Sequence, residues 1–225
     1  LIQIRQLWKS FGDQVVLEKL NLDVAQGEFC TLVGASGCGK TTFLRMLLGE
    51  EQQTRGALLL DGEPMPHEPG PERGIVFQRY SVFPHLSVLR NVMLGPELQQ
   101  SRILGRVWGA KRTAVREEAL ALLEQVGLSA AKDRYPSELS GGMQQRLAVA
   151  QALFMKPRVL LLDEPFGALD PGIRADMHVL VRDLWQRNKL TVFMVTHDLG
   201  EAFALGTRML VFDKIRRDSQ APNAY

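Results

Sequence analysis

The chain alternates short apolar runs with longer stretches whose apolar positions recur at helical spacing. Short runs bounded by turn residues predict strands. Two of them, 159–162 and 192–195, contain no polar residue, which is typical of strands buried on both faces of a parallel sheet. Strands that alternate with helices in this way predict an α/β fold. The predicted strands are 2–7, 15–24, 29–33, 57–60, 75–77, 159–162, 192–195 and 209–212.

Between Gln78 and Pro157 the pattern becomes helical, which predicts a helical lobe inserted into the α/β core. One apolar stripe ends at Gly127, which suits a C-terminal helix cap, and a second ends before Pro157. A third helix is predicted after Asp170, its expected N-cap, with Pro171 in the first turn. The first two stripes consist of Val115, Ala119, Leu122, Leu123 and Val126, and of Met143, Leu147, Ala150, Leu153 and Phe154.

The length of the chain limits the number of domains, and its net charge limits the kinds of partner. A chain of 225 residues can bury a full core, so we expect a single domain over residues 1–225. We divide it into a core of residues 1–78 and 157–225 and a helical lobe of residues 79–156. The 27 basic and 25 acidic residues give a net charge of +2. No strong field therefore favours nucleic acid or anionic lipid as a partner.

The cysteines and the hydropathy pattern indicate a compartment. Cys30 lies in a predicted strand and Cys38 in a glycine-rich loop, so we expect no disulfide and a reducing cytosol. We expect no signal peptide, and no apolar run approaches the roughly 18 residues needed to cross a bilayer. Any membrane association is therefore expected to come through another polypeptide.

A glycine-rich segment between a predicted strand and a predicted helix carries the first chemical motif. It fits the pattern G-x-x-x-x-G-K-[ST], in which glycines let backbone N–H groups face phosphates. Lys40 is expected to reach the β- and γ-phosphates, and the Thr41 hydroxyl to bind Mg²⁺. A chance glycine-rich turn is the alternative, but it would arise in about one chain in a hundred or fewer. The segment, here called the phosphate loop, consists of Gly34, Ala35, Ser36, Gly37, Cys38, Gly39, Lys40, Thr41 and Thr42.

Two carboxylates, Asp163 and Glu164, directly follow the apolar run 159–162. They are expected at the carboxyl edge of the sheet, where α/β proteins bind their ligands. A solvated acidic turn is the alternative, and the expected nearness of the phosphate loop argues against it.

The second motif is residues 139–146, which read LSGGMQQR and are here called the signature segment. Ser140 lies a hundred residues after Lys40 (140 − 40 = 100) and is expected to cap a helix. Gly141 and Gly142 would expose backbone N–H groups at the N-terminus of that helix, which makes a second anion site. An ordinary serine-capped helix does not explain the glycine pair, since each helical glycine costs about 1 kcal/mol. Together with the phosphate loop, this segment resembles the signature sequence of ABC-type ATPases, and the resemblance covers nearly the whole chain.

The resemblance implies a P-loop NTPase (RecA-like) α/β core with an N-terminal antiparallel β region and an inserted helical signature lobe. It implies that Asp163 organises Mg²⁺ and that Glu164 is the general base that polarises the attacking water. Gln78 would contact the metal or the water and take part in catalysis, although a glutamine after a strand is ordinarily a surface residue. The cofactors implied are ATP and Mg²⁺.

Three further positions match the family pattern. His197 would be the switch histidine that hydrogen-bonds the γ-phosphate, although a lone histidine is more often structural. Phe11, supported by Val16, would stack on adenine, and the alternative is a core aromatic. Asp170 matches the D-loop, and the same aspartate can also cap the following helix.

The resemblance also implies partners. Ser140, Gly141, Gly142 and Gln144 would contact the nucleotide held by a second ATPase subunit, because two subunits pack head to tail. A two-fold dimer, expected to be a homodimer, gives two equivalent sites. Transmembrane permease subunits and, indirectly, a periplasmic solute-binding protein complete the expected assembly, with no nucleic acid. The protein is then expected at the cytoplasmic face of the inner or plasma membrane.

Two segments, 70–78 and 164–170, resemble the ATPase subunits of nitrate, sulfonate and taurine importers. Arg79 and His85 depart from the pattern of many relatives, which leaves the cargo open. The chain stops soon after the predicted strand 209–212, so we expect it to lack the regulatory domain that some sugar-importer ATPases carry.

We therefore expect the ATP-binding and ATP-hydrolysing subunit of an ABC transporter that imports a small anionic or nitrogen- or sulfur-containing solute (nitrate, sulfonate, taurine or a related compound). ATP-driven closure of the dimer is expected to power the transport. The alternatives are an export ATPase, a non-transport ABC ATPase or a binding module without turnover. DNA-repair members insert a long coiled coil, whereas Ser140 follows Gln78 by only 62 residues (140 − 78 = 62). Translation factors of the family carry two cassettes in one chain. Glu164 and His197 argue against an inactive module.

Two further expectations concern single segments. Cys38 is either a reactive thiol that ATP protects, because a helix N-terminus and Lys40 favour a thiolate, or a small residue whose sulfur turns away from solvent. The apolar and aromatic segment 79–86 is expected to form part of a groove for a permease helix, with core packing of Phe83 as the alternative.

Overall fold

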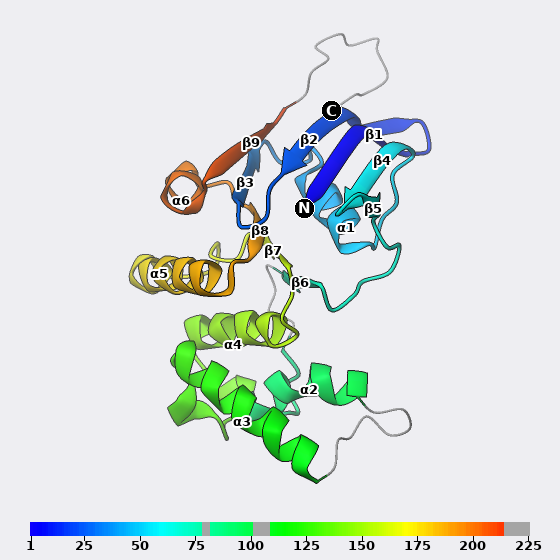
Figure 1. Cartoon of the computed structure of the whole chain (residues 1–225). Coiled ribbons are helices and arrows are strands. Elements are labelled where there is room, and N and C mark those ends of the chain that lie inside the picture. Colours follow the sequence, from blue (N-terminus) through cyan, green and yellow to red (C-terminus); the bar gives the residue numbers. More distant parts are fainter. Residues whose placement is uncertain (78–81, 101–108, 214–225) are drawn as a thin grey trace.

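The computed structural model describes residues 1–77, 82–100 and 109–213, and it places two β-sheets above a group of helices (Figure 1). The first sheet is antiparallel, with strand order β2-β1-β4-β5. Its strands are β1 (Ile2–Phe11), β2 (Gln14–Val24), β4 (Arg55–Leu60) and the short β5 (Glu63–Pro64). This sheet is the predicted N-terminal antiparallel region.

The second sheet is parallel, with strand order β6-β7-β8-β3-β9. Because all of its strands run the same way, their carboxyl ends share one edge, and the chain segments that leave this edge can build a site together. The strands are β3 (Phe29–Gly34), β6 (Arg73–Val76), β7 (Val159–Asp163), β8 (Thr191–Val195) and β9 (Arg208–Phe212).

Helix α1 (Lys40–Leu48) lies between the two sheets, as its buried contacts show. Successive side chains of a strand point to opposite faces, and β7 follows this rule. Leu161 packs with α1 and the antiparallel sheet, whereas Leu160 and Leu162 pack with the helices on the other face. The apolar run therefore fills two cores at once, which explains why it lacks the polar alternation of a half-exposed strand.

The other face of the parallel sheet shares one apolar cluster with the helical lobe. The lobe's helices α2, α3 and α4 lie at the far end of the molecule from the antiparallel sheet (Figure 1). Helices α5 and α6 flank the parallel sheet. The helices are α2 (Val88–Gln100), α3 (Ala110–Gln125), α4 (Gly141–Phe154), α5 (Pro171–Asn188) and α6 (Leu199–Leu205), with 3₁₀ turns at Ser129–Ala131 and Pro136–Glu138.

Each predicted strand has a counterpart in the structure, and three details differ. Phe77 lies just beyond β6, and β5, only two residues long, carries no pattern that could predict it. Asp170 takes the N-cap position of α5, but its side chain accepts no capping hydrogen bond, so the predicted cap is wrong in this respect. Among the described residues no helix is long and apolar enough to span a membrane.

Candidate functional site

The phosphate loop connects β3 to α1 and wraps around the side chain of Lys40. The Lys40 Nζ donates to the backbone oxygens of Gly34 at 2.8 Å and Ala35 at 2.9 Å. The side chain is buried, with 8% of the residue exposed. The loop thus holds one ammonium group directly beside the N-terminus of α1, and both favour a bound anion.

Gly39 is a glycine for two reasons. Its φ of 96° lies in the left-handed region, and a Cβ there would lie 2.7 Å from Leu17 Cδ2 and 3.1 Å from Val16 Cγ1. The phosphate loop can therefore pack directly against β2. This contact brings Val16, predicted to support adenine binding, to the wall of the same site.

A cavity of about 480 Å³ opens over the phosphate loop. Such a volume is in the range of ligand sites. Its walls come from β2, the phosphate loop, the first turn of α1 and the segments after β7 and β8, which meet at one sheet edge. The lining residues are Val16, Gly34, Ser36, Gly37, Gly39, Lys40, Thr41, Thr42, Glu164 and His197, so the fold brings half of the residues predicted from sequence to this one cavity.

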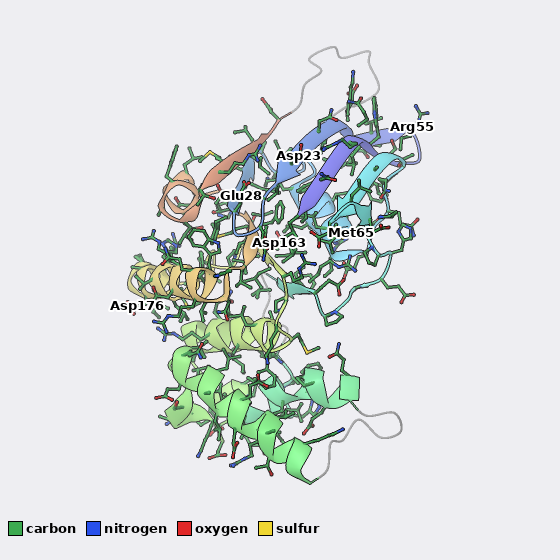
Figure 2. The ribbon with its side chains drawn as sticks, in the orientation of Figure 1. Asp23, Glu28, Arg55, Met65, Asp163 and Asp176 are labelled. Carbon is green, nitrogen blue, oxygen red and sulfur yellow. The ribbon has the colours of Figure 1, made fainter. Side chains whose placement is uncertain are left out.

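Asp163 ends β7 and accepts a hydrogen bond from the Thr41 side chain. Burial raises the pKa of its carboxyl group, and the neighbouring Glu164 raises it further, while the Thr41 hydrogen bond works in the opposite direction. Figure 2 shows Asp163 near the centre of the molecule. Two adjacent carboxylates and a hydroxyl present the hard oxygen ligands that Mg²⁺ prefers, so these residues fit the predicted metal.

Glu164 and His197 are neighbours across two strand ends. His197 Nδ1 lies 3.2 Å from Glu164 Oε1, and the His197 side chain is 65% exposed. The Glu164 backbone has φ 48°, the left-handed region that non-glycine residues rarely adopt, and its N–H bonds the Val195 oxygen at 3.0 Å. Strained backbone of this kind costs of order 1–3 kcal/mol and is concentrated at functional sites.

A buried carboxylate, Glu201, anchors the segment that carries His197. Thr196 Oγ1 donates to Glu201 Oε2 at 2.6 Å, while Arg174 Nε and His178 Nε2 each lie 3.7 Å from Oε1. Burial alone would raise the pKa of Glu201, but the nearby His178 imidazole and the hydrogen bond from Thr196 outweigh it and hold the pKa below its ordinary range. The motif analysis did not single out Glu201, although its position three residues after Asp198 has the spacing of a capping box.

Replacing Glu201 with Gln is expected to destabilise the fold at pH 7 and not in acid. Because the pKa is lower in the folded state, the carboxylate contributes stability above its unfolded pKa of about 4.3. That contribution disappears as the pH falls through the folded pKa. We expect a loss of about 1.5–3 kcal/mol in unfolding free energy at pH 7, the usual worth of hydrogen bonds to a charged group.

Urea unfolding of the wild type and of Glu201→Gln across this pH range would measure the difference. Glu117→Gln, an exposed change on α3, is the control. A difference that stays constant with pH would show that the charge of Glu201 has no part in it.

The signature segment begins α4 as predicted. Ser140 Oγ accepts from the Met143 N–H at 3.3 Å, and the Gln144 side chain folds back to the Pro136 oxygen at 3.0 Å. Gly141 is exposed, but Gly142 is buried, and a Cβ on it would lie 2.5 Å from Ile173 Cγ2 of α5. Close packing of α4 on α5 is therefore a reason for the second glycine that the sequence did not reveal. None of these residues lines the cavity over the phosphate loop.

The remaining predicted residues either lie outside the lining of the cavity or fall outside the described part of the chain. Phe11 ends β1 and is 48% exposed, which excludes the alternative of a core aromatic. Phe11 lies outside the lining of the cavity, as do Ala35, Cys38, Asp163 and Asp170. Gln78 lies outside the described residues.

The structure contradicts the hypothesis that Cys38 is an accessible thiol. Cys38 is 1% exposed and borders an apolar pocket between β2 and β9, and Lys40 Nζ lies 3.6 Å from its sulfur. The alternative, a small residue whose sulfur turns away from solvent, fits this burial. Cys30 is buried too, and burial, followed by the charge of Glu28, raises the pKa of its thiol to about 12.

Residues 17–167 match the family model described as ABC transporter. Because the match covers more than half of the chain, the chain belongs to the ABC transporter family, as an ATP-binding domain.

Two relatives are named as import proteins. The chain is 42% identical to the spermidine/putrescine import ATP-binding protein PotA of Bacillus thuringiensis over 216 residues, which is 95% of this chain and 63% of the relative. It is 40% identical to the Fe(3+) ions import ATP-binding protein FbpC of Escherichia coli O157:H7, over 95% of this chain and 59% of the relative. The chain thus spans about six tenths of the length of these curated relatives. Neither name belongs to the nitrate, sulfonate and taurine group expected from sequence.

Two solved structures share the fold over almost the whole chain. A dimeric, post-hydrolysis state of the ATP-binding cassette MJ0796, bound to ADP and Pi, gives a TM-score of 0.78 at 29% identity and covers 95% of this chain and 94% of that one. The structure of cbiO1 from Clostridium perfringens, part of the ABC transporter complex cbiONQ, gives 0.82 at 25% identity, covering 94% and 84%.

Proposed function

We propose that this chain is the ATP-binding and ATP-hydrolysing subunit of an ABC importer. The observation that carries the proposal is that one cavity is lined by Lys40, Thr41, Glu164 and His197. Beside it, Asp163 accepts a hydrogen bond from Thr41. A phosphate loop with its lysine, a hydroxyl and an aspartate able to hold Mg²⁺, and a residue able to position water are parts that recur in P-loop enzymes of phosphoryl transfer.

Each residue has a role that its position supports. The phosphate-loop N–H groups and Lys40 bind the β- and γ-phosphates, and Val16 and Phe11 hold the adenine. Glu164 takes a proton from the attacking water. His197, which already contacts Glu164, hydrogen-bonds the γ-phosphate. Thr41 and Asp163 would hold Mg²⁺, which neutralises phosphate charge when bound.

The signature segment is proposed to act on a partner's nucleotide. It forms the N-terminus of α4 with Gly141 exposed, and it lies outside the cavity that holds Lys40. A second copy packed head to tail would place each signature segment over the other subunit's ATP. The dimeric state of the related MJ0796 cassette supports this arrangement.

A groove at the junction of core and lobe is proposed to receive the permease. It has a volume of about 400 Å³, and β6, α2 and α4 supply its walls. Phe83 lines it and is 42% exposed, which argues against core packing of this ring. The buried Asn91 fixes the segment, since its Oδ1 accepts from the Phe83 N–H at 2.8 Å and its Nδ2 donates to the Leu86 oxygen at 2.8 Å. Of the predicted segment 79–86, residues 79–81 lie outside the described residues.

Cysteines introduced at this groove are expected to crosslink to the permease. Phe83→Cys and Leu98→Cys place thiols at two of its exposed walls, and Val179→Cys on α5 is an equally exposed control away from it. The measurement is a crosslinked band with permease in membranes after the cysteine is labelled with a maleimide–benzophenone reagent and illuminated, because the benzophenone inserts into C–H bonds of any neighbouring chain. Equal crosslinking at Val179→Cys, or none at both groove positions, would contradict the docking site.

The cargo is set by the proteins that bind it. Segments 70–78 and 164–170 support a nitrate-, sulfonate- or taurine-like importer. The cargo names of the relatives, spermidine/putrescine and Fe(3+), support a cationic cargo instead. The chain is proposed to work at the cytoplasmic face of the membrane, attached through the permease and served indirectly by a periplasmic binding protein.

Co-purification with membrane subunits, followed by ATPase assays with loaded binding protein, tests the proposal. Stimulation by an anionic or a cationic cargo would separate the two classes of importer. ATPase activity that neither membrane subunits nor loaded binding protein raise would favour a non-transport ABC ATPase, and stimulation by a cytoplasmic substrate would favour an exporter.

A further inference from the structure

Lys9 of β1 is a buried lysine with three partners close to its ammonium. Only 8% of the residue is exposed. Its Nζ lies 2.7 Å from Glu51 Oε2, donates to the Gln52 oxygen at 2.9 Å, and stands 4.5 Å from the centroid of the Phe11 ring. A buried charge must be paired and hydrogen-bonded to persist, and this one is.

Two of the three partners of Lys9, Glu51 and Gln52, come from the segment that follows α1. That segment is tied to the C-terminal turn of α1, where the Glu50 and Glu51 N–H groups donate to the Arg45 oxygen at 2.9 and 3.3 Å. It is also tied to β1, since the Ser10 N–H donates to Thr54 Oγ1 at 2.9 Å. Lys9 therefore links the far end of the helix that begins at the phosphate loop to the aromatic ring at the end of β1.

The Lys9 ammonium lies over one face of the Phe11 ring, and 48% of Phe11 remains exposed. A cation over a ring is attracted to its face and constrains the ring's orientation. An exposed phenylalanine near a hairpin end would otherwise lose rotamer freedom on binding a ligand, and a ring held in advance avoids that cost.

We propose that Lys9 is a positioning residue for the nucleotide base: it holds Phe11 as a preformed stacking surface for adenine. The inference rests on the proposed function, in which Phe11 stacks on adenine. Lys9 touches Phe11 and not the ligand, so it acts through the ring. The competing explanation is that Lys9 and Glu51 form a structural ion pair with no effect on nucleotide.

Lys9→Met is expected to weaken ATP binding about three- to tenfold, in line with a partly desolvated cation–π contact. It should leave the affinity for inorganic tripolyphosphate unchanged, because that probe engages only the phosphate loop. Lys9→Arg should restore ATP binding, since a guanidinium also sits over aromatic rings. Lys111→Met, an exposed change at the start of α3, is the matched control. Competition against a fluorescent ATP analogue on the whole chain supplies the dissociation constants.

A double-mutant cycle with Phe11→Ala separates the possible failures. If Lys9 acts through the ring, Lys9→Met should add almost nothing once Phe11 is Ala. If Phe11→Ala itself leaves ATP affinity unchanged, the stacking role in the proposed function fails. If Phe11→Ala weakens ATP binding while Lys9→Met does not, or if Lys9→Met weakens ATP and tripolyphosphate equally, the positioning role of Lys9 is overturned.

Discussion

Replacing Glu164 with Gln is expected to slow ATP hydrolysis by roughly 10²- to 10⁴-fold, the usual worth of a positioned general base. ATP binding should persist, because Lys40 and the phosphate-loop N–H groups are untouched. Gln keeps the size of the side chain and its contact with His197 while removing the basic oxygen. Because ATP is expected to close the dimer and its hydrolysis and release to open it, the variant should also accumulate as an ATP-bound dimer.

Single-turnover hydrolysis and gel filtration with ATP would measure both effects. Glu124→Gln, an exposed change on α3, controls for the loss of a negative charge. Wild-type turnover in Glu164→Gln would mean that another group activates the water.

Gly141→Glu is the second substitution with a large expected effect. A carboxylate at the N-terminus of α4 would repel the partner's phosphates, so ATPase activity should fall to background. Affinity of a single chain for ATP should change little, because the signature segment lies outside the cavity around Lys40. Gly141 is the suitable position, since it is exposed, whereas a side chain at Gly142 would collide with Ile173.

Mixing two inactive variants tests the dimer directly. A heterodimer of Lys40→Ala and Gly141→Glu chains contains one composite site with an intact phosphate loop and an intact signature segment. Partial ATPase activity in the mixture, absent from either variant alone, is the expected result. Loss of ATP binding by monomeric Gly141→Glu would contradict action on the partner's nucleotide. Gln125→Glu on α3 controls for the added charge.

The fold was predictable wherever one local pattern decided it. The apolar run of β7 is buried on both faces, and Ser140 caps α4 as its position predicts. The capping hydrogen bond of Asp170 could not be predicted in this way, because a residue at the N-cap position need not turn its side chain toward the helix. The difference lies in tertiary surroundings, which a single-residue preference does not contain.

The residues that line the candidate site could be predicted from sequence motifs, whereas the buried residues that hold them in place could not. Lys40, Glu164 and His197 belong to recognisable segments, and the sheet edge brings them together. Glu201 and Lys9 are charged residues that reasoning from composition places on the surface, yet partners distant in sequence bury both. The burial of Cys38 follows in the same way from the packing of β2 and β9 around the phosphate loop.

The left-handed backbone at Glu164, with φ 48°, sets stability against the proposed role of this residue in hydrolysis. Glycine adopts this region freely, whereas other L-residues lose about 1–2 kcal/mol in it. Sequences selected only for resistance to heat should therefore drift toward Gly or Asn at position 164 and lose ATPase activity as they do so. If Glu164 has the proposed role, selection for hydrolysis is what keeps a glutamate at this position. A library screened for folding alone should therefore lose glutamate at position 164.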